Sequence, residues 1–165
     1  MLDKIIGSIG ELSKLNLYLA QGPATTQDLR RLIEKMQMSY GLDAVFVDYL
    51  QLLRDRHGSN SNERIGFISN ELASISKEFN TPLVVLSQLN RAADSREDKR
   101  PHLSDLRESG SIEQDADLIL FLYRDSYYKR DAGTEAELII AKDRLRGTSG
   151  KLKLIWEARN ENYIG

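Results

Sequence analysis

Two apolar runs in this sequence end in polar side chains that could bind a metal ion or a phosphate. Asp48 comes directly after the apolar residues 44–47, and Gln88 ends the run that begins at residue 83. Such runs are typical of buried parallel strands, and α/β proteins hold their ligands at the carboxyl ends of these strands. A carboxylate in that place can hold the Mg²⁺ of a nucleotide through water, and an amide can orient a water or sense a γ-phosphate.

Plainer interpretations of these two residues stay open at this point. Asp48 could cap the turn that follows it, and Gln88 could hydrogen-bond to the backbone of a nearby loop. The two histidines, His57 and His102, lie in expected loops. Neither has a second ligand at a usable spacing, so we assign neither of them to a metal site.

The polar segment 103–117 places charged and amide side chains between two apolar runs, residues 83–88 and 118–123. Both runs are expected to be strands buried on two faces. Solvation alone does not explain so dense a group of polar side chains between buried strands. The segment is therefore a candidate ligand site.

A basic pair, Lys142 and Arg144, follows a third strand-like run. Alternate residues of a strand point to the same side, so the pair suits a two-pronged clamp on phosphate if the strand continues this far. Arg146, Lys151 and Lys153 add to the positive charge nearby. A solvated basic turn is the alternative interpretation.

Composition limits what these residues can belong to. The chain has 165 residues, 41% hydrophobic and 29% charged, which predicts one globular domain over residues 1–165. It has no cysteine, which excludes disulfides and thiolate metal sites. No signal-peptide pattern or run of ~20 apolar residues is present, so we expect a cytoplasmic protein without a membrane partner. The net charge of -2 means that any nucleic-acid binding must come from local patches or from many copies together.

Hydrophobic periodicity predicts the elements that position these groups. The expected helices are the end of one over residues 2–14, one capped by Thr25 with Asp28 and stopped by Gly41, and one over residues 63–79, after a polar loop at 54–62. The expected strands cover residues 16–20, 43–49, 83–88, 118–123, 137–142 and 151–156, the last two joined tightly through Gly147 and Gly150. Helix-separated strands followed by closely joined ones predict an α/β fold: a mainly parallel sheet flanked by helices, with antiparallel edge strands at the carboxyl end.

Residues 43–53, residues 86–91 and the polar segment 103–117 together resemble the DnaB-type replicative DNA helicases. The likeness runs from about Gly10 to the end of the chain, with the motifs in the right order. It implies a RecA-like ATPase domain, incomplete at its amino-terminal side, that belongs to the carboxyl-terminal half of a hexamer. By the same resemblance, the complete protein uses ATP and Mg²⁺ to move 5′ to 3′ on single-stranded DNA, with a primase and a helicase loader as possible partners.

The resemblance also implies roles for individual residues. Asp48 resembles the Walker B aspartate, which holds Mg²⁺ through water, and Gln88 resembles the residue that senses the γ-phosphate and couples it to DNA. Three residues fall on the loop that holds the backbone of single-stranded DNA in the family: Arg107, Glu108 and Gly110. The remaining two, Lys142 and Arg144, resemble the pair that reaches the ATP site of the neighbouring subunit, with the arginine as a finger.

Two departures from the family pattern stand out. The family commonly has Asn-Gly-Pro after the finger, where this chain has residues 145–150. The sequence also has no G-x-x-x-x-G-K-[ST] phosphate loop, and the family's catalytic glutamate has no counterpart. We expect that the chain begins after those elements, that one copy alone does not hydrolyse ATP, and that a sheet edge and apolar surface stay uncovered.

Two other functions stay open. The chain could be a non-catalytic module that binds single-stranded DNA or forms oligomers, an idea motivated by the absence of the phosphate-loop motif. It could also be another RecA-like ATPase, such as a recombination or circadian-clock relative. Residues 105–110 argue against the second idea, because those relatives carry other loops at this point.

Overall fold

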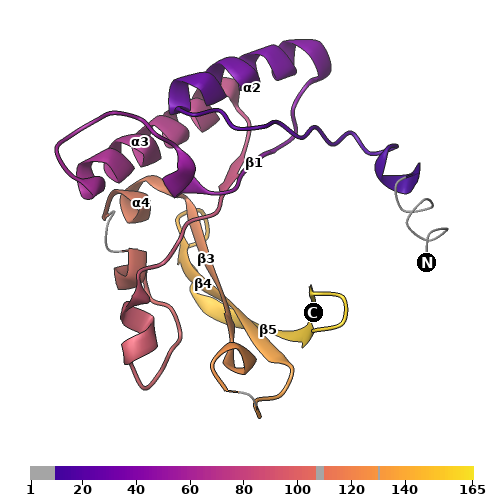
Figure 1. Ribbon diagram of the computed structural model, residues 1–165, viewed down its shortest axis with the longest axis vertical. Coiled ribbons are helices and arrows are strands. Elements are labelled where there is room, and N and C mark those ends of the chain that lie inside the picture. The colour runs from indigo at the N-terminus through magenta and orange to yellow at the C-terminus, as the bar shows by residue number, and fades with distance from the viewer. Residues whose placement is uncertain (1–9, 107–109, 130) are drawn as a thin grey trace.

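The computed structural model describes residues 10–106, 110–129 and 131–165 (Figure 1). Its helices are α2 (Thr26–Tyr40), α3 (Ser61–Phe79) and α4 (Gly110–Asp115). Its strands are β1 (Val45–Val47), β2 (Leu83–Val85), β3 (Leu118–Arg124), β4 (Glu135–Asp143), β5 (Gly150–Glu157) and β6 (Asn162–Ile164). Four 3-10 turns lie between them, at Leu50–Leu52, Arg91–Ser95, Leu103–Leu106 and Asp125–Tyr127. The sequence did not predict α4 or β6.

Helix α2 begins and ends as predicted. The Thr25 hydroxyl accepts a hydrogen bond from the backbone N–H of Asp28 at 3.2 Å, and the Asp28 carboxylate accepts one from the backbone N–H of Thr25 at 3.1 Å. This reciprocal capping box satisfies two N–H groups that the first turn leaves free. Gly41 ends the helix with a φ of 73°, a conformation that disfavours residues with a Cβ.

Helix α3 begins slightly earlier than expected, because Asn60 caps it by accepting a hydrogen bond from the backbone N–H of Glu63 at 2.9 Å. Four apolar residues at helical spacing along α3 are buried, which confirms the predicted helix: Ile65, Ile68, Leu72 and Ile75. They form one core with buried side chains of α2 and of the turn after β1: Leu29, Ile33, Leu50 and Leu53.

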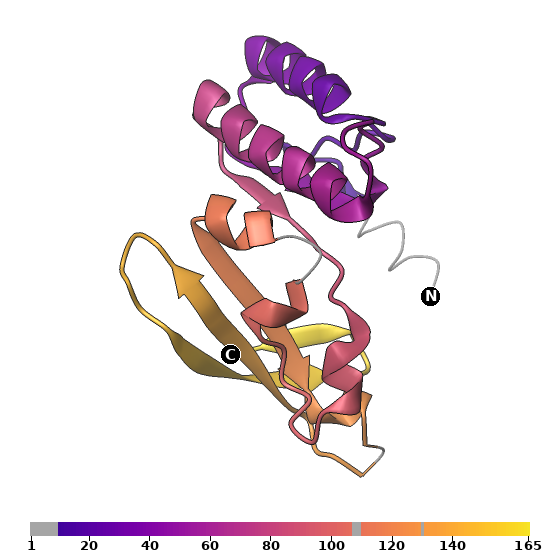
Figure 2. The ribbon, with the colours of Figure 1, turned by 90° about the vertical axis from the view of Figure 1, so that its left-hand side faces the viewer.

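Strands β1 and β2 pair in parallel, with Val45 opposite Leu83 and Val47 opposite Val85. Parallel pairing was predicted, but both strands are shorter than expected: the chain turns at Leu50–Leu52 after β1, and β2 ends at Val85 opposite the last residue of β1. Side chains on one face of the pair pack against the core of α2 and α3. Figure 2 shows these two helices side by side above the remainder of the fold. On the other face, Phe46 is 70% exposed.

A separate antiparallel sheet has the strand order β3-β4-β5-β6. Its β4–β5 connection is the predicted tight one, and Gly147 has the positive φ of 62° that such a turn requires. On β3, Ile119, Phe121 and Tyr123 are buried beneath the segments that precede the sheet. In the described part of the chain, the parallel sheet has two strands and the antiparallel sheet has four.

The expectation that runs 83–88 and 118–123 are buried on two faces was wrong. Alternate side chains of a strand reach opposite faces of a sheet, and only one face of each run is covered here. Leu118, Leu120 and Leu122 are each about half exposed, at 52%, 46% and 54%. This uncovered surface agrees with the expectation of exposed apolar area.

The predicted strand at residues 16–20 was also wrong. These residues form no strand and lie exposed. Tyr18 stacks on Tyr40 of α2, with ring centroids 4.8 Å apart, but no described sheet edge pairs with the segment's backbone. An apolar run becomes a strand only when another strand takes up its backbone hydrogen bonds. Of the helix expected at 2–14, residues 10–12 are helical and residues 1–9 lie outside the described ranges.

Candidate functional site

Parallel pairing brings Asp48 and Gln88 to the same edge of the β1–β2 sheet. Asp48 directly follows β1, and Gln88 lies shortly after β2. The side chain of Gln51 connects the two strand ends. Its Oε1 accepts a hydrogen bond from the backbone N–H of Gln88 at 3.2 Å, and its Nε2 donates to the Ser87 hydroxyl at 3.1 Å. The sequence did not reveal this link, because Ser87 and Gln88 are distant from Gln51 in the chain.

The side chains of Asp48 and Gln88 are both exposed. Within the described ranges, neither side chain makes a hydrogen bond, so neither of the plainer interpretations is seen. A free carboxylate at the carboxyl end of a parallel strand fits a Mg²⁺ ion bound through water. In the part of the chain that the structure describes, no three His, Cys, Asp or Glu side chains gather into a metal site. Asp48 could therefore supply only one contact of such a site.

Lys142 lies in β4 and Arg144 directly follows the end of that strand, and both side chains reach the backbone oxygen of Gln114. The Lys142 ammonium donates to the backbone oxygens of Glu113 and Gln114, the second at 3.4 Å. Arg144 donates from Nη2 to the backbone oxygen of Gln114, and from Nη1 to the Asp117 carboxylate at 2.6 Å. The shared acceptor on Gln114 shows that the two cations lie together. Their hydrogen bonds go to α4 and Asp117 rather than to Asp48 or Gln88.

The turn after β4 is where this chain departs from the Asn-Gly-Pro pattern. Here the Asp143 carboxylate accepts hydrogen bonds from the backbone N–H groups of Leu145 and Arg146, at 3.1 and 3.0 Å, and from the Thr148 hydroxyl at 3.1 Å. The pKa of the Asp143 carboxyl is lowered, chiefly because the hydrogen bond from the backbone N–H of Arg146 stabilises the charged form. An aspartate that binds the backbone just after it thus forms a tight turn without proline.

Of the predicted DNA loop, Arg107 and Glu108 lie outside the described residues. Gly110 is the first residue of α4 and is exposed. A Cβ added to Gly110 would meet nothing within 4 Å, so the structure leaves open space beside this backbone. That space is compatible with the approach of a DNA strand.

Helix α3 holds α4 in place through small and polar residues. A Cβ at Gly66 would lie 2.8 Å from the Ser111 hydroxyl, so the two helices approach closely at this glycine. The Ser69 hydroxyl donates to the Asp115 carboxylate at 2.7 Å. The first half of the chain thereby positions the helix that begins at Gly110.

The chain before the predicted DNA loop is held by a buried ion pair. The Asp105 side chain is 1% exposed and accepts two hydrogen bonds from the guanidinium of Arg96, at 2.8 and 2.6 Å. The backbone N–H of His102 donates to the same carboxylate at 2.9 Å. These contacts, led by the bond from Arg96, hold the pKa of Asp105 below its usual value. Bidentate arginine–carboxylate pairs are among the strongest polar contacts in proteins.

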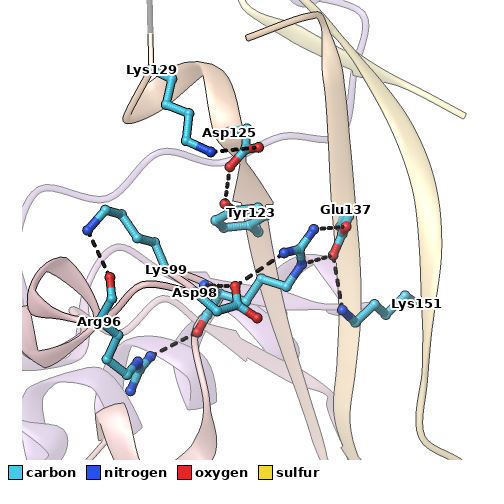
Figure 3. Close-up of polar contacts among 9 residues, drawn as sticks. Arg96, Asp98, Lys99, Tyr123, Asp125, Lys129, Glu137 and Lys151 are labelled. Atoms are coloured by element: carbon cyan, nitrogen blue, oxygen red, sulfur yellow. Dashed lines mark hydrogen bonds and ion pairs between the residues drawn. The ribbon is translucent and has the colours of Figure 1, made fainter.

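A second network attaches the charged loop at residues 89–102 to the antiparallel sheet (Figure 3). Arg100 donates to the Glu137 carboxylate from Nε at 2.8 Å and from Nη2 at 2.6 Å, and its guanidinium lies 4.7 Å from the ring centroid of Tyr123. The Tyr123 hydroxyl in turn donates to Asp125. Burial, together with this bond, raises the pKa of Tyr123 to about 12. The sequence showed only a charged loop here, because charge runs do not reveal which partners the fold brings together.

This arrangement of helices, parallel strands and an antiparallel sheet is that of RecA-like ATPase domains. One solved structure, described as an ATPase domain, superposes with a TM-score of 0.91 and 35% identity, covering 99% of this chain and 60% of that one. A solved DnaB-like replicative helicase, described together with its interactions with primase, gives a TM-score of 0.89 and 36% identity over 99% of this chain and 41% of that one. The predicted RecA-like fold is confirmed.

The chain belongs to the DnaB-like helicase C terminal domain family, whose model matches residues 1–164. It is 40% identical over 166 residues to the replicative DNA helicase DnaB of Geobacillus stearothermophilus, and 38% identical over 166 residues to the replicative DNA helicase DnaC of Bacillus subtilis. Each alignment covers 98% of this chain and 36% of the relative, so the chain spans about a third of the length of these relatives. The predicted family is confirmed.

None of the helices in residues 10–106, 110–129 and 131–165 is both long and apolar enough to span a lipid bilayer.

Proposed function

We propose that this chain supplies part of the ATPase and DNA-translocating machinery of a hexameric replicative helicase in the cytoplasm, with residues 1–165 as one partial RecA-like domain. Family membership supports helicase function, and the parallel pairing of β1 and β2 is the single observation that carries the site. That pairing holds Asp48 and Gln88 at one edge with free side chains. The complete machine couples ATP hydrolysis to 5′ to 3′ movement on single-stranded DNA.

At the nucleotide, Asp48 holds a water of the hydrated Mg²⁺, and Gln88 senses the γ-phosphate. When bound, the ion neutralises charge on the phosphates. The Gln51 side chain accepts a hydrogen bond from the backbone N–H of Gln88 and so fixes the position of Gln88 relative to the chain after β1. Gln51 therefore acts as a positioning residue. The sequence offers no phosphate-loop motif, so most direct contacts to a triphosphate are absent from it. We therefore propose that the chain alone does not hydrolyse ATP.

At the subunit boundary, Lys142 and Arg144 bind the phosphates of the neighbouring subunit's ATP. Their shared contact with the Gln114 oxygen supports this role, because two cations that lie together can grip a phosphate together. A finger arginine that stabilises charge in the transition state is worth ~10³ to 10⁵ in rate.

On the DNA side, Arg107, Glu108 and Gly110 hold the backbone of the single strand. A backbone-tracking loop does not read base edges, so we expect no sequence specificity. We further propose that a primase and a helicase loader bind the complete protein. A solved DnaB-like relative is described with its primase interactions, and this supports the first of these partners.

The test joins this chain to a phosphate-loop segment from the Geobacillus stearothermophilus relative and measures ATP hydrolysis with and without single-stranded DNA. We expect DNA-stimulated hydrolysis that is lost in Asp48→Ala and in Arg144→Ala, and kept in the matched control Arg146→Ala. Mixing the two inactive variants should restore activity at sites that combine one intact residue from each subunit. A joined protein without DNA-stimulated hydrolysis would contradict the proposal.

A non-catalytic module is the second candidate, and the absence of a phosphate-loop motif from the sequence favours it. Such a module binds single-stranded DNA or forms oligomers without using ATP. Fluorescence anisotropy of the 165-residue chain with labelled single-stranded DNA tests this candidate. Binding should weaken with added salt and in Arg107→Ala, since backbone contacts release counterions. An affinity that neither change alters would count against it. The third idea, a recombination or clock relative, receives no support from the family match.

A further inference from the structure

The carboxyl end of α4 exposes backbone oxygens that its own short turn cannot satisfy. The oxygen of Ile112 accepts the N–H of Ala116 at 3.0 Å, which completes one helical hydrogen bond. The last carbonyl groups of any helix lack such a partner and need an external donor. For Glu113 and Gln114 that donor is the basic pair at the end of β4, Lys142 and Arg144. The pair therefore acts as a cap on α4.

Each terminal nitrogen of the Arg144 guanidinium makes one hydrogen bond in this arrangement. One terminal nitrogen binds Asp117 and the other binds the oxygen of Gln114, while the backbone N–H of Arg144 donates to the oxygen of Asp117 at 2.8 Å. Arginine binds phosphate through pairs of parallel N–H groups, and the two terminal nitrogens that contact Asp117 and Gln114 form one such pair. A phosphate that binds both terminal nitrogens as a pair therefore competes with the Asp117 carboxylate and the Gln114 oxygen for Arg144.

The contact is also weak enough to be exchanged. The side chain of Arg144 is 46% exposed and that of Asp117 is 63% exposed, and ion pairs in contact with water contribute little net free energy. Releasing the carboxyl end would not free the whole of α4. The hydrogen bond from Ser69 to Asp115 and the close approach of Gly66 to Ser111 would still hold α4 against α3.

We infer that phosphate binding at Lys142 and Arg144 and capping of α4 by the same two residues exclude each other. A polyphosphate at the pair releases the carboxyl end of α4. The inference rests on the phosphate role proposed above and adds a regulation of that site. The released end belongs to the same short helix whose first residue is Gly110, the described residue of the proposed DNA loop.

Hydrogen exchange on the 165-residue chain, with and without saturating tripolyphosphate, tests this directly. We expect exchange in residues 110–117 to rise about two- to fivefold, the size of a lost exposed ion pair. Residues 61–79 of α3 serve as the internal reference and should not change. Calorimetry under the same conditions should show tripolyphosphate binding that Arg144→Gln or Lys142→Gln weakens. Arg146→Gln, a basic residue beside the pair, is the matched control and should leave binding unchanged.

Asp117→Asn separates competition from simple attraction. It removes the charge that holds Arg144 and keeps the size of the side chain, so tripolyphosphate should bind about two- to fivefold more tightly. Exchange in residues 110–117 should already be raised without ligand, and the further rise on binding should shrink. If Asp117 acted only by its charge, Asp117→Asn would change the affinity for tripolyphosphate, but hydrogen exchange in residues 110–117 without ligand would equal that of the original protein.

Two outcomes would overturn the inference, and only the second of them would also overturn the phosphate role of Lys142 and Arg144. If tripolyphosphate binds through Arg144 and exchange in residues 110–117 does not rise, the mutual exclusion is wrong and the phosphate role stands. If neither Arg144→Gln nor Lys142→Gln affects tripolyphosphate binding, or no binding occurs, the phosphate role of the pair fails and the inference fails with it.

Discussion

The region around β1 and β2 and the region around β3–β6 are held together by different kinds of contact. Among the described residues, eight buried apolar side chains form one cluster in the first region, including Ile68 and Ile75, which are both 0% exposed. In the described part of the second region, the apolar cluster has three buried members: Leu106, Ile119 and Phe121. Ion pairs supply much of the remaining contact there, chiefly Arg96 with Asp105 and Arg100 with Glu137.

This difference matches what each region is proposed to do. The apolar cluster is insensitive to pH and salt, so it gives Asp48 and Gln88 a fixed support at the strand ends. Polar contacts in the second region can be exchanged for other polar partners at smaller cost. That property suits segments that contact DNA and a neighbouring subunit. The two regions meet where α3 packs on α4.

The largest expected effect is in the first region. Ile68→Ala removes most of a fully buried side chain, and the cavity and lost burial together should lower the free energy of unfolding by about 3 to 4 kcal/mol. Urea denaturation followed by circular dichroism measures this. Met38→Ala on α2, where the side chain is 81% exposed, is the control and should change stability by less than about 0.5 kcal/mol. A small loss in Ile68→Ala would show that this cluster does not dominate the stability of the region.

In the second region, Asp105→Asn should cause a smaller loss of stability. The change keeps the shape of the side chain but leaves the Arg96 guanidinium without its charged acceptor, which should cost about 2 kcal/mol. Fluorescence of Trp156, the only tryptophan of the chain and part of β5, reports unfolding of this region. Asp43→Asn makes the same chemical change at an exposed position. If both variants lose an equally small amount of unfolding free energy, the pair of Arg96 and Asp105 does not stabilise this region.

The effect of Asp105→Asn should also depend on pH. Arg96 holds the pKa of folded Asp105 below its usual value, so this carboxylate stabilises the fold fully above the unfolded pKa of about 3.9. Its contribution is lost as the pH falls through the lower, folded pKa. The difference in unfolding free energy between the two proteins should be constant from pH 7 to about pH 5 and shrink below about pH 4. A difference that persists unchanged at about pH 3 would assign the effect to packing instead of charge.

The smallest effect is expected at the edge of the polar network. Lys151 lies 3.4 Å from the Glu137 carboxylate and its side chain is 51% exposed, so Lys151→Gln should cost less than about 0.5 kcal/mol. Urea denaturation followed by Trp156 fluorescence is the measurement. A loss as large as that of Asp105→Asn would mean that the network in Figure 3 acts as one cooperative unit.

Much of the local structure was predictable because its causes are local. The Thr25–Asp28 capping box, the inward stripe of α3 and the tight β4–β5 turn depend on residues a few positions apart. The strand expected at residues 16–20 failed for the opposite reason. Its apolar pattern is real, but a strand also needs a partner backbone, and the described structure provides none.

The candidate site was predictable to a similar degree. Asp48 directly follows β1 and Lys142 lies near the end of β4 as expected, whereas Gln88 lies beyond the end of β2, which is shorter than predicted. The contacts of Lys142 and Arg144 with α4 were not predicted, and neither was the link through Gln51. Each of these joins residues that are far apart in the chain.

By itself, the sequence determined the type and order of the main elements, the residues able to do chemistry, and the family to which they belong. These follow from periodicity, capping and motif spacing, which act over short distances along the chain. Only the tertiary structure decided which charged groups meet, which faces of the sheets stay uncovered, and that a predicted phosphate clamp caps the helix beside the predicted DNA loop. Long-range contacts depend on how strands pair and helices pack, and no single segment carries that information.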